Sequence, residues 1–301
     1  MKPAGALIAA GLWAAAGAAG AQSVAYGALE RLAPGPSACP GGLCQADALS
    51  AVFRRLAGAG AGAGEPVPVV HIRQIGDSHT AGGRITGAVR TRLQARFGHA
   101  PAPAGPAVEG HGERRPGVLF FESGRVGATL HHLPEWPDDE VAGGPPPGAA
   151  DLVILAFGTN EGFEDALDAA AYEALLRSQV DRLRRLTPAP SLLILGAPDA
   201  LRSGVEAGCS ADGRRAPPPS LAVVRDVQRR VAADLGVAFW DWHGRMGGDC
   251  SADRLASRAE PLMHGDGVHF TGAGADWIGG VLADDLIAAY EAWKAGPGGA
   301  D

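Results

Sequence analysis

Three short polar clusters in this chain hold the residue types from which a nucleophile, a base and an anion-binding site can be built. The first, Gly76-Asp77-Ser78-His79-Thr80, comes directly after an apolar run and shortly before a helical pattern. A serine in that place lies near a helix N-terminus, where the helix dipole favours developing negative charge. Taken alone, Gly-Asp-Ser is typical of plain turns, and Thr80 stands where a nucleophile elbow carries its second glycine.

The second cluster, Gly158-Thr159-Asn160-Glu161, follows a continuous apolar run. One interpretation is a helix N-cap, because an Asn or Thr side chain accepts hydrogen bonds from the first turn of a helix starting near Glu164. The other is that the side-chain amide of Asn160 points into a site and donates a hydrogen bond to an oxyanion. The cluster alone leaves both interpretations open.

The third cluster is Asp266-Gly267-Val268-His269-Phe270-Thr271, just before the last helical pattern. An Asp three residues before a His can fold back and accept the Nδ1–H of the imidazole, which leaves Nε2 free to act as a base. The alternative is that Thr271 caps the helix and that Asp266 and His269 are ordinary loop residues.

Together, and in this order, the clusters resemble the sequence blocks of the SGNH (GDSL-type) hydrolases. Ser78 matches the first block, Asn160 the third, and Asp266 with His269 the last. In the second block, between those of Ser78 and Asn160, the family has a glycine whose backbone N–H belongs to the oxyanion hole. Gly127, in the run Val-Gly-Ala-Thr, fits that place.

The resemblance spans roughly residues 69–286, which is most of the chain. It implies a flavodoxin-like, three-layer α/β/α fold and ester hydrolysis through an acyl-serine, with no metal and no other cofactor. The implied catalytic residues are Ser78, Asp266 and His269, and the implied oxyanion hole comprises Ser78, Gly127 and Asn160.

Two positions depart from the family pattern. His79 replaces the usual leucine of the GDSL signature, and Arg125 lies where many relatives carry a small residue or Asn. The variants G-D-S-H-T and G-T-N-E are similar to those of exported bacterial peptidoglycan or polysaccharide O-acetylesterases, as are Phe239-Trp240-Asp241-Trp242 and Met246-Gly247-Gly248. This narrower resemblance implies an O-acetylated glycan as the ester substrate.

Hydrophobic periodicity predicts strands that alternate with helices, which is typical of right-handed βαβ crossovers and a parallel sheet. In such sheets, ligands bind beyond the carboxyl ends of the strands, where all three clusters fall. The predicted strands are residues 67–75, 118–121, 152–157, 192–195 and 237–240. The predicted helices are residues 46–57, 84–97, 164–186, 221–235 and 272–293.

The N-terminal segment suggests export. Lys2, a short apolar stretch and Ala19-Gly20-Ala21 predict a signal peptide over residues 1–21, cleaved after Ala21. A membrane-anchoring helix is the alternative, but the stretch is shorter than the roughly 20 residues needed to span a bilayer, so we expect no transmembrane segment in the mature chain. We predict an N-terminal extension with one helix and a linker over 22–66, the hydrolase domain over 67–295 and a disordered tail over 296–301.

Four cysteines in an exported chain predict disulfides, although four allow three connectivities. We predict Cys39–Cys44, which closes a short Pro-Gly-Gly turn, and Cys209–Cys250, which joins two polar loops. A zinc site is disfavoured, because neither pair is C-x-x-C.

Composition limits the partners. A charge of −7, with no Lys/Arg stripe, argues against nucleic acid. The resemblance and the predicted export together imply a periplasmic or secreted serine esterase that acts on acyl, above all acetyl, esters. An O-acetyltransferase with the same triad, a lysophospholipase or thioesterase, and a non-catalytic glycan-binding protein are the alternatives. Three tryptophans could stack on sugars or simply pack in the core: Trp136, Trp240 and Trp242.

Overall fold

The computed structural model describes residues 32–61, 69–99, 117–142, 150–203, 208–210 and 213–299. Contacts group residues from Pro34 onward into one compact unit; of the preceding unit, Met1–Ala33, only the last two residues are described. The predicted signal peptide and its cleavage site after Ala21 lie outside the described residues. No helix in the described ranges is long and apolar enough to cross a membrane.

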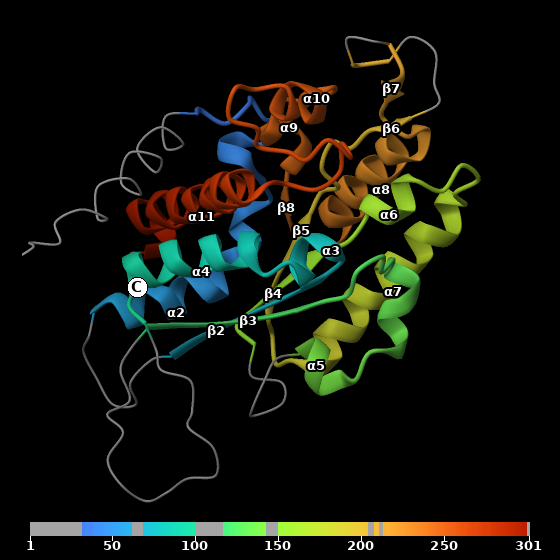
Figure 1. Ribbon diagram of the computed structural model, residues 1–301. Helices are drawn as coiled ribbons and strands as arrows, with labels where there is room; N and C mark the ends of the chain where they lie inside the picture. Colours follow the sequence, from blue (N-terminus) through green and yellow to red (C-terminus); the bar gives the residue numbers. More distant parts are fainter. Residues whose placement is uncertain are drawn as a thin grey trace, which may run out of the picture. The chain divides into compact units, whose positions relative to one another are not determined.

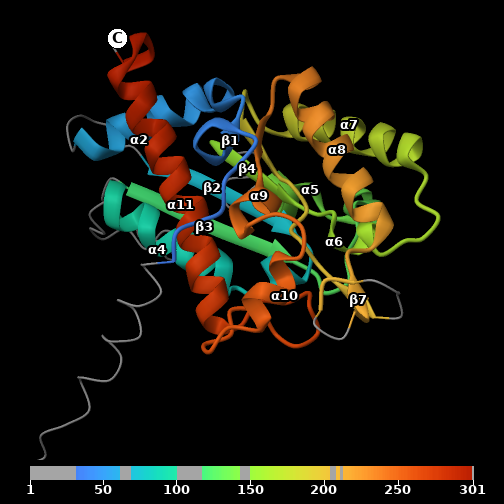
Figure 2. The same ribbon diagram turned by 90° about the horizontal axis from the view of Figure 1, so that it is seen from above.

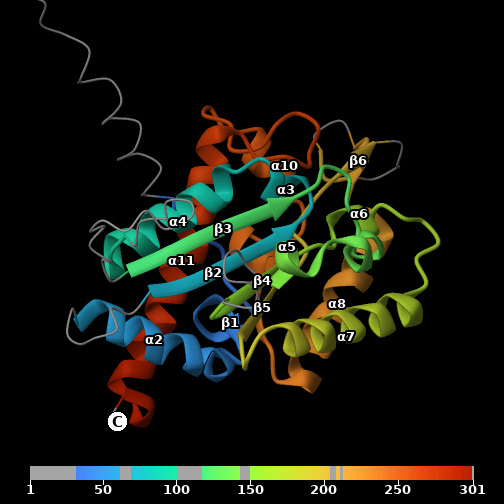
Figure 3. The ribbon, with the colours of Figure 1, turned by 90° about the horizontal axis from the view of Figure 1, so that it is seen from below.

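Within the described residues, six strands form the central sheet, in the order β1-β8-β5-β4-β2-β3 (Figures 1 and 3). Numbered along the chain, the five parallel strands lie in the order 2-1-3-4-5, which is the flavodoxin-like order. The parallel strands are β2 (Val69–Gly76), β3 (Gly117–Gly124), β4 (Leu152–Ala156), β5 (Ser191–Leu195) and β8 (Ala238–Trp240). The edge strand β1 (Leu43–Cys44) runs antiparallel to β8.

Helices cover both faces of this sheet, so the predicted three-layer α/β/α fold is confirmed (Figures 1 and 2). One face carries α2 (Ser50–Ala61), α4 (Arg84–Phe97) and α11 (Gly272–Ala295). The other carries α5 (Asp138–Ala142), α7 (Ala169–Leu186) and α8 (Pro219–Leu235). Shorter elements are η1 (Pro40–Gly42), η2 (Ala46–Leu49), α3 (Ser78–Ala81), η3 (Leu130–Glu135), α6 (Thr159–Gly162), β6 (Arg202–Ser203), β7 (Arg215–Ala216), α9 (Trp242–Met246), α10 (Ser251–Ala256) and η5 (Pro297–Gly299).

The middle of the sheet is buried on both faces. Every residue of β4 is buried, as its continuous apolar run predicts. Val153 and Leu155 of β4 join Ile194 of β5 in one apolar cluster with Val180 of α7 and Val224 of α8. This rigid centre holds the carboxyl ends of the strands, from which the polar clusters extend.

The segment before the first predicted strand also packs on the sheet. Residues 34–61 belong to the same compact unit as the rest of the fold, and β1 adds a strand that the sequence did not predict. The carboxylate of Asp241, just after β8, accepts hydrogen bonds from the Ser37 hydroxyl and the Ala38 N–H. Both predicted disulfides, Cys39–Cys44 and Cys209–Cys250, are confirmed.

Two helices begin four or five residues later than predicted, and α8 begins two residues earlier, at Pro219. The helix predicted from residue 164 begins at Ala169, because Asp168 caps it by accepting the N–H groups of Ala170 and Ala171 at 3.0 Å. The helix predicted from residue 46 begins as η2 and becomes α2 only at Ser50. In the predicted disordered tail, Pro297–Gly299 form a 3₁₀ turn.

Candidate active site

Strand β2 ends in the turn that carries Ser78. A glycine is needed at position 76, since a Cβ there would lie only 2.4 Å from the carbonyl oxygen of Ala156, at the end of the neighbouring strand β4. Asp77 then caps α3, because its Oδ1 accepts the N–H of His79 at 2.9 Å. Ser78 is therefore the first residue of α3, at the carboxyl end of β2. The chain passes from β2 to β3 on one side and then to β4 on the other, so this is the topological switch point of the sheet.

The loop before α11 folds around the carboxylate of Asp266. Its Oδ1 accepts the backbone N–H groups of Val268 at 2.9 Å and of His269 at 3.0 Å, and its Oδ2 lies 2.8 Å from His269 Nδ1. Leu201 ties the loop to the segment after β5, because its N–H donates to the Gly267 carbonyl at 2.8 Å. The three hydrogen bonds of Asp266 fix the direction of the His269 ring.

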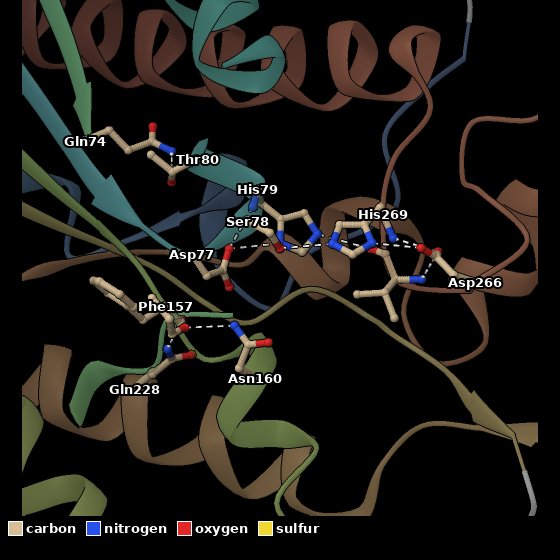
Figure 4. Close-up of polar contacts among 12 residues, drawn as sticks. Gln74, Asp77, Ser78, His79, Thr80, Phe157, Asn160, Gln228, Asp266 and His269 are labelled. Carbon is tan, nitrogen blue, oxygen red and sulfur yellow. Dashed lines mark hydrogen bonds and ion pairs between the residues drawn. The ribbon is translucent and has the colours of Figure 1, made fainter. Parts of the chain in front are cut away.

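This loop brings His269 to Ser78 across a long separation in the sequence. The Oγ of Ser78 lies 3.0 Å from Nε2 of His269, on the side of the ring opposite Asp266 (Figure 4). Since a carboxylate only accepts, Nδ1 carries the proton, and Nε2 is left to accept the Ser78 hydroxyl. The side chains of His269 and Asp266 are each 47% exposed, so the arrangement is open to solvent.

Asp266 is ionised in this arrangement. Burial alone would raise its pKa, but hydrogen bonds from the backbone N–H groups of His269 and Val268 and from the His269 ring outweigh that effect. They hold the pKa of Asp266 below its usual value. The carboxylate can therefore orient the imidazole and balance a positive charge on it.

Gly127 lies in the turn that follows β3. Its φ of +74° favours glycine, and Arg125 of the same turn donates its N–H to the Gly76 carbonyl at 3.1 Å. That hydrogen bond links the Gly127 turn to the turn of Ser78. Across the part of the chain that the structure describes, the N–H groups of Ser78 and Gly127 donate to no protein acceptor. Both can bind an anion.

Asn160 joins the same group of loops from β4. Its side-chain Nδ2 donates to the carbonyl of Ala128 at 2.8 Å, so the amide faces the Gly127 turn. The N-cap interpretation of Asn160 is wrong, because Asp168 caps the next long helix. An amide has two N–H donors, and the second is available to a ligand.

Glu161, for which the sequence pattern indicates no role, secures this side of the site. Its Oε1 accepts the N–H of Leu130 at 2.6 Å, which fixes the far end of the Gly127 turn. Burial raises the pKa of Glu161 to about 7, although the hydrogen bond from Leu130 opposes the rise. A cavity of about 200 Å³ adjoins it, lined by Leu130, His131, Glu161, Glu164, Ala166, Leu167, Asp168, Ala171 and Tyr172.

Trp242, just after β8, packs against residues that flank Ser78 and His269. Trp242 packs edge-to-face on the His79 ring, with centroids 5.4 Å apart, and stacks on Phe270. A half-buried ion pair between Arg245 and Asp285 links α9 to α11, and Asp285 also accepts the indole N–H of Trp240 on β8. Residue spacing gave no signal for this support, because its members come from separate elements.

The sugar-stacking interpretation of the tryptophans is wrong. Trp136 and Trp240 are each 1% exposed, and Trp242 is 3% exposed, so all three pack inside the fold. None offers a ring face to a sugar.

One group of side chains in the described ranges could hold a metal ion. Asp199, His243 and Asp249 have ligand atoms that all lie within 4.8 Å of one another. However, the guanidinium of Arg225 lies 3.9 Å from Asp249 Oδ1 and already supplies a positive charge there. None of these residues belongs to the hydrogen-bonded series of Ser78, His269 and Asp266.

Comparison with known proteins shows a family and a fold. A model of the GDSL-like lipase/acylhydrolase family matches residues 75–277, which is more than half of the chain. A search of curated proteins finds no match.

Solved structures share the fold at low identity. A peptidoglycan O-acetylesterase is 23% identical, with a TM-score of 0.67, over 83% of this chain and 99% of that chain. The acetyl xylan esterase AlAXEase is 16% identical, with a TM-score of 0.52, over 73% of this chain and 99% of that chain. An acetyl xylan esterase from Geobacillus stearothermophilus is 18% identical, with a TM-score of 0.50, over 72% and 94%. The chain therefore belongs to the GDSL-like lipase/acylhydrolase (SGNH) family and is a carboxylic ester hydrolase.

Proposed function

We propose that the protein removes acetyl groups from an O-acetylated glycan outside the cytoplasm, with Ser78 as nucleophile, His269 as general base and Asp266 as its orienting carboxylate. The hydrogen-bonded series from Ser78 Oγ through His269 to Asp266 is the observation that carries this proposal. It supports the proposal because a hydroxyl, an imidazole and a carboxylate joined in this order are what a nucleophile, its base and an orienting counter-charge require.

In the acylation step, His269 Nε2 takes the hydroxyl proton of Ser78 as Oγ attacks the ester carbonyl. The imidazolium then gives that proton to the leaving alcohol of the sugar, and the acyl group stays on Oγ. In the second step, a water loses a proton to His269 and attacks the acyl-serine. Ser78 recovers its proton as the acid departs.

In this mechanism, three donors bind the carbonyl oxygen as it becomes negative. They are the N–H groups of Ser78 and Gly127 and the second amide N–H of Asn160. Their hydrogen bonds to an oxyanion are stronger than those to the neutral carbonyl, which lowers the barrier.

The acetyl-glycan substrate rests on the named activities of structures that share the fold and on the block variants of the sequence. The extracytoplasmic location rests on the predicted signal peptide and on the two disulfides, which persist in oxidising compartments.

The test compares the wild-type protein with Ser78→Ala on 4-nitrophenyl acetate, butyrate and octanoate, and on O-acetylated peptidoglycan and xylan. We expect release of acetate by the wild type, a steep fall with acyl length, and a loss of roughly 10⁴-fold or more in Ser78→Ala. Ser178→Ala, an exposed serine of α7, is the matched control. Unchanged turnover in Ser78→Ala would refute the nucleophile, and a preference for octanoate would refute the acetyl substrate.

A further inference from the structure

His79 is a buried histidine that the proposed acyl transfer does not use. Only 6% of its surface is exposed. Its Nδ1 lies 3.1 Å from Oδ1 of Asp77, and its Nε2 lies 3.1 Å from the carbonyl oxygen of Val268. The ring therefore bridges the turn that carries Ser78 and the loop that carries His269 (Figure 4).

The partners of His79 define its protonation state. The Val268 carbonyl only accepts hydrogen bonds, and so does an ionised Asp77 carboxylate. A neutral imidazole has a single N–H, so one of its nitrogens would face an oxygen with two lone pairs opposed. Only the imidazolium donates on both sides. Asp77, itself 1% exposed, supplies the counter-charge that makes a buried cation tolerable.

The charges around the ring agree with this state. Burial alone would lower the pKa of His79, but the charge and hydrogen bond of Asp77, the Val268 carbonyl and the charge of Asp266 together raise it. From the other elements, the ring meets His269 at 5.6 Å between centroids and two uncharged aromatic rings, those of Trp242 and Phe270.

The bridge closes a ring of contacts through the proposed triad. The backbone of Val268 contacts both residues: its carbonyl accepts from His79, and its N–H donates to Asp266 at 2.9 Å. Asp266 accepts from the His269 imidazole, and His269 meets Ser78, which is covalently bonded to His79. Each link in this ring restrains the next.

We propose that His79 is a positioning residue, held as an imidazolium between Asp77 and the Val268 carbonyl, that sets the distance between Ser78 and His269. The proposal rests on the proposed function for its kinetic consequence, but its protonation state can be tested without any substrate.

The first experiment measures the protonation of the ring directly. Protein labelled with ¹⁵N-histidine is examined by long-range ¹H–¹⁵N correlation at pH 7.5, about one unit above the usual pKa of histidine. The His79 signals are identified by their loss in His79→Gln. We expect both ring nitrogens of His79 to carry protons at this pH. A spectrum in which either nitrogen lacks its proton would overturn the proposal.

The second experiment measures the effect on catalysis. His79→Leu puts an apolar side chain in this place and removes both side-chain hydrogen bonds, while His79→Gln supplies an amide N–H that can reach the Val268 carbonyl. Since a misplacement of about 1 Å can cost 10²-fold, we expect kcat on 4-nitrophenyl acetate to fall ten- to a hundredfold in His79→Leu, with KM within about twofold. His79→Gln should recover part of the loss. Wild-type kcat in a folded His79→Leu would overturn the positioning role.

The two proposals fail in different ways. If Ser78→Ala keeps full activity, the proposed function is wrong, whereas the ring nitrogens of His79 still report the bridge. If His79→Leu does not fold, the spectrum of the wild-type protein still decides the protonation state.

Discussion

The two sides of the site differ in how far their polar groups are already paired. On the base side, Asp266, His269 and Ser78 are hydrogen-bonded in series, and the Val268 peptide is held at both its N–H and its carbonyl. On the anion side, the N–H groups of Ser78 and Gly127 have no acceptor within the described ranges. A base needs its tautomer before the reaction starts, whereas an oxyanion exists only during it.

The two sides also differ in the charge of their carboxylates. Hydrogen bonds lower the pKa of Asp266 on the base side, while burial raises the pKa of Glu161 to about 7 on the anion side. An ionised carboxylate beside an oxyanion would oppose its formation. The anion side therefore holds its buried carboxyl partly neutral near pH 7, and the base side keeps its own ionised.

The largest expected effect comes from breaking the base side. In Asp266→Asn, the amide oxygen can still accept the backbone N–H groups, but the amide N–H faces His269 Nδ1 and favours the wrong tautomer. We expect kcat on 4-nitrophenyl acetate to fall roughly 10³- to 10⁴-fold. Asp276→Asn, on the surface of α11, is the matched control and should leave kcat unchanged. A loss below tenfold in Asp266→Asn would contradict the assigned role.

A smaller loss is expected on the anion side. Asn160→Ala removes one of the proposed oxyanion donors and the hydrogen bond to Ala128, while the Ser78–His269 contact stays. We expect kcat to fall roughly 10²- to 10³-fold with little change in KM, because the lost donor acts mainly in the transition state. Steady-state kinetics separate the two constants. A change confined to KM would show that Asn160 binds the substrate and does not stabilise the oxyanion.

The smallest effect should appear in stability. Because the pKa of Glu161 is raised to about 7, the unfolded chain loses this proton first as the pH rises, and the folded state loses stability between about pH 4.5 and 7. Glu161→Gln keeps an acceptor for Leu130 and cannot ionise. We expect it to be more stable than the wild type at pH 8, relative to pH 4, by up to roughly 3 kcal/mol. Urea unfolding at both pH values measures the difference. Equal pH dependence of stability in the two proteins would contradict the raised pKa of Glu161.

Local patterns were sufficient for the parts of the fold that repeat along the chain. The helix predicted over residues 84–97 is α4 without change, and the apolar run before Asn160 is the fully buried strand β4. The order of strands and helices indicated a parallel sheet. The edge strand β1 escaped prediction, since two residues show no periodicity and their pairing partner lies on β8.

The site divides in the same way. Residue types and block order pointed to Ser78, Asp266 and His269 as the candidate triad, because the Asp–His pair is close in sequence and its geometry is local. Asn160 could be read as a helix cap or as a donor, and only the hydrogen bond to Ala128 showed which loop its amide faces. For Glu161, the folded chain provides the burial that raises its pKa.

The amino-acid sequence determined which residues were available for chemistry and the order of the elements that carry them. The tertiary structure decided which groups meet: Ser78 and His269 lie 191 positions apart and come together at 3.0 Å. It also placed the two partners of His79 on opposite sides of its ring, one near in the sequence and one distant. A side chain's charge and hydrogen bonds depend on what surrounds it in space, and local sequence patterns do not encode those distant neighbours.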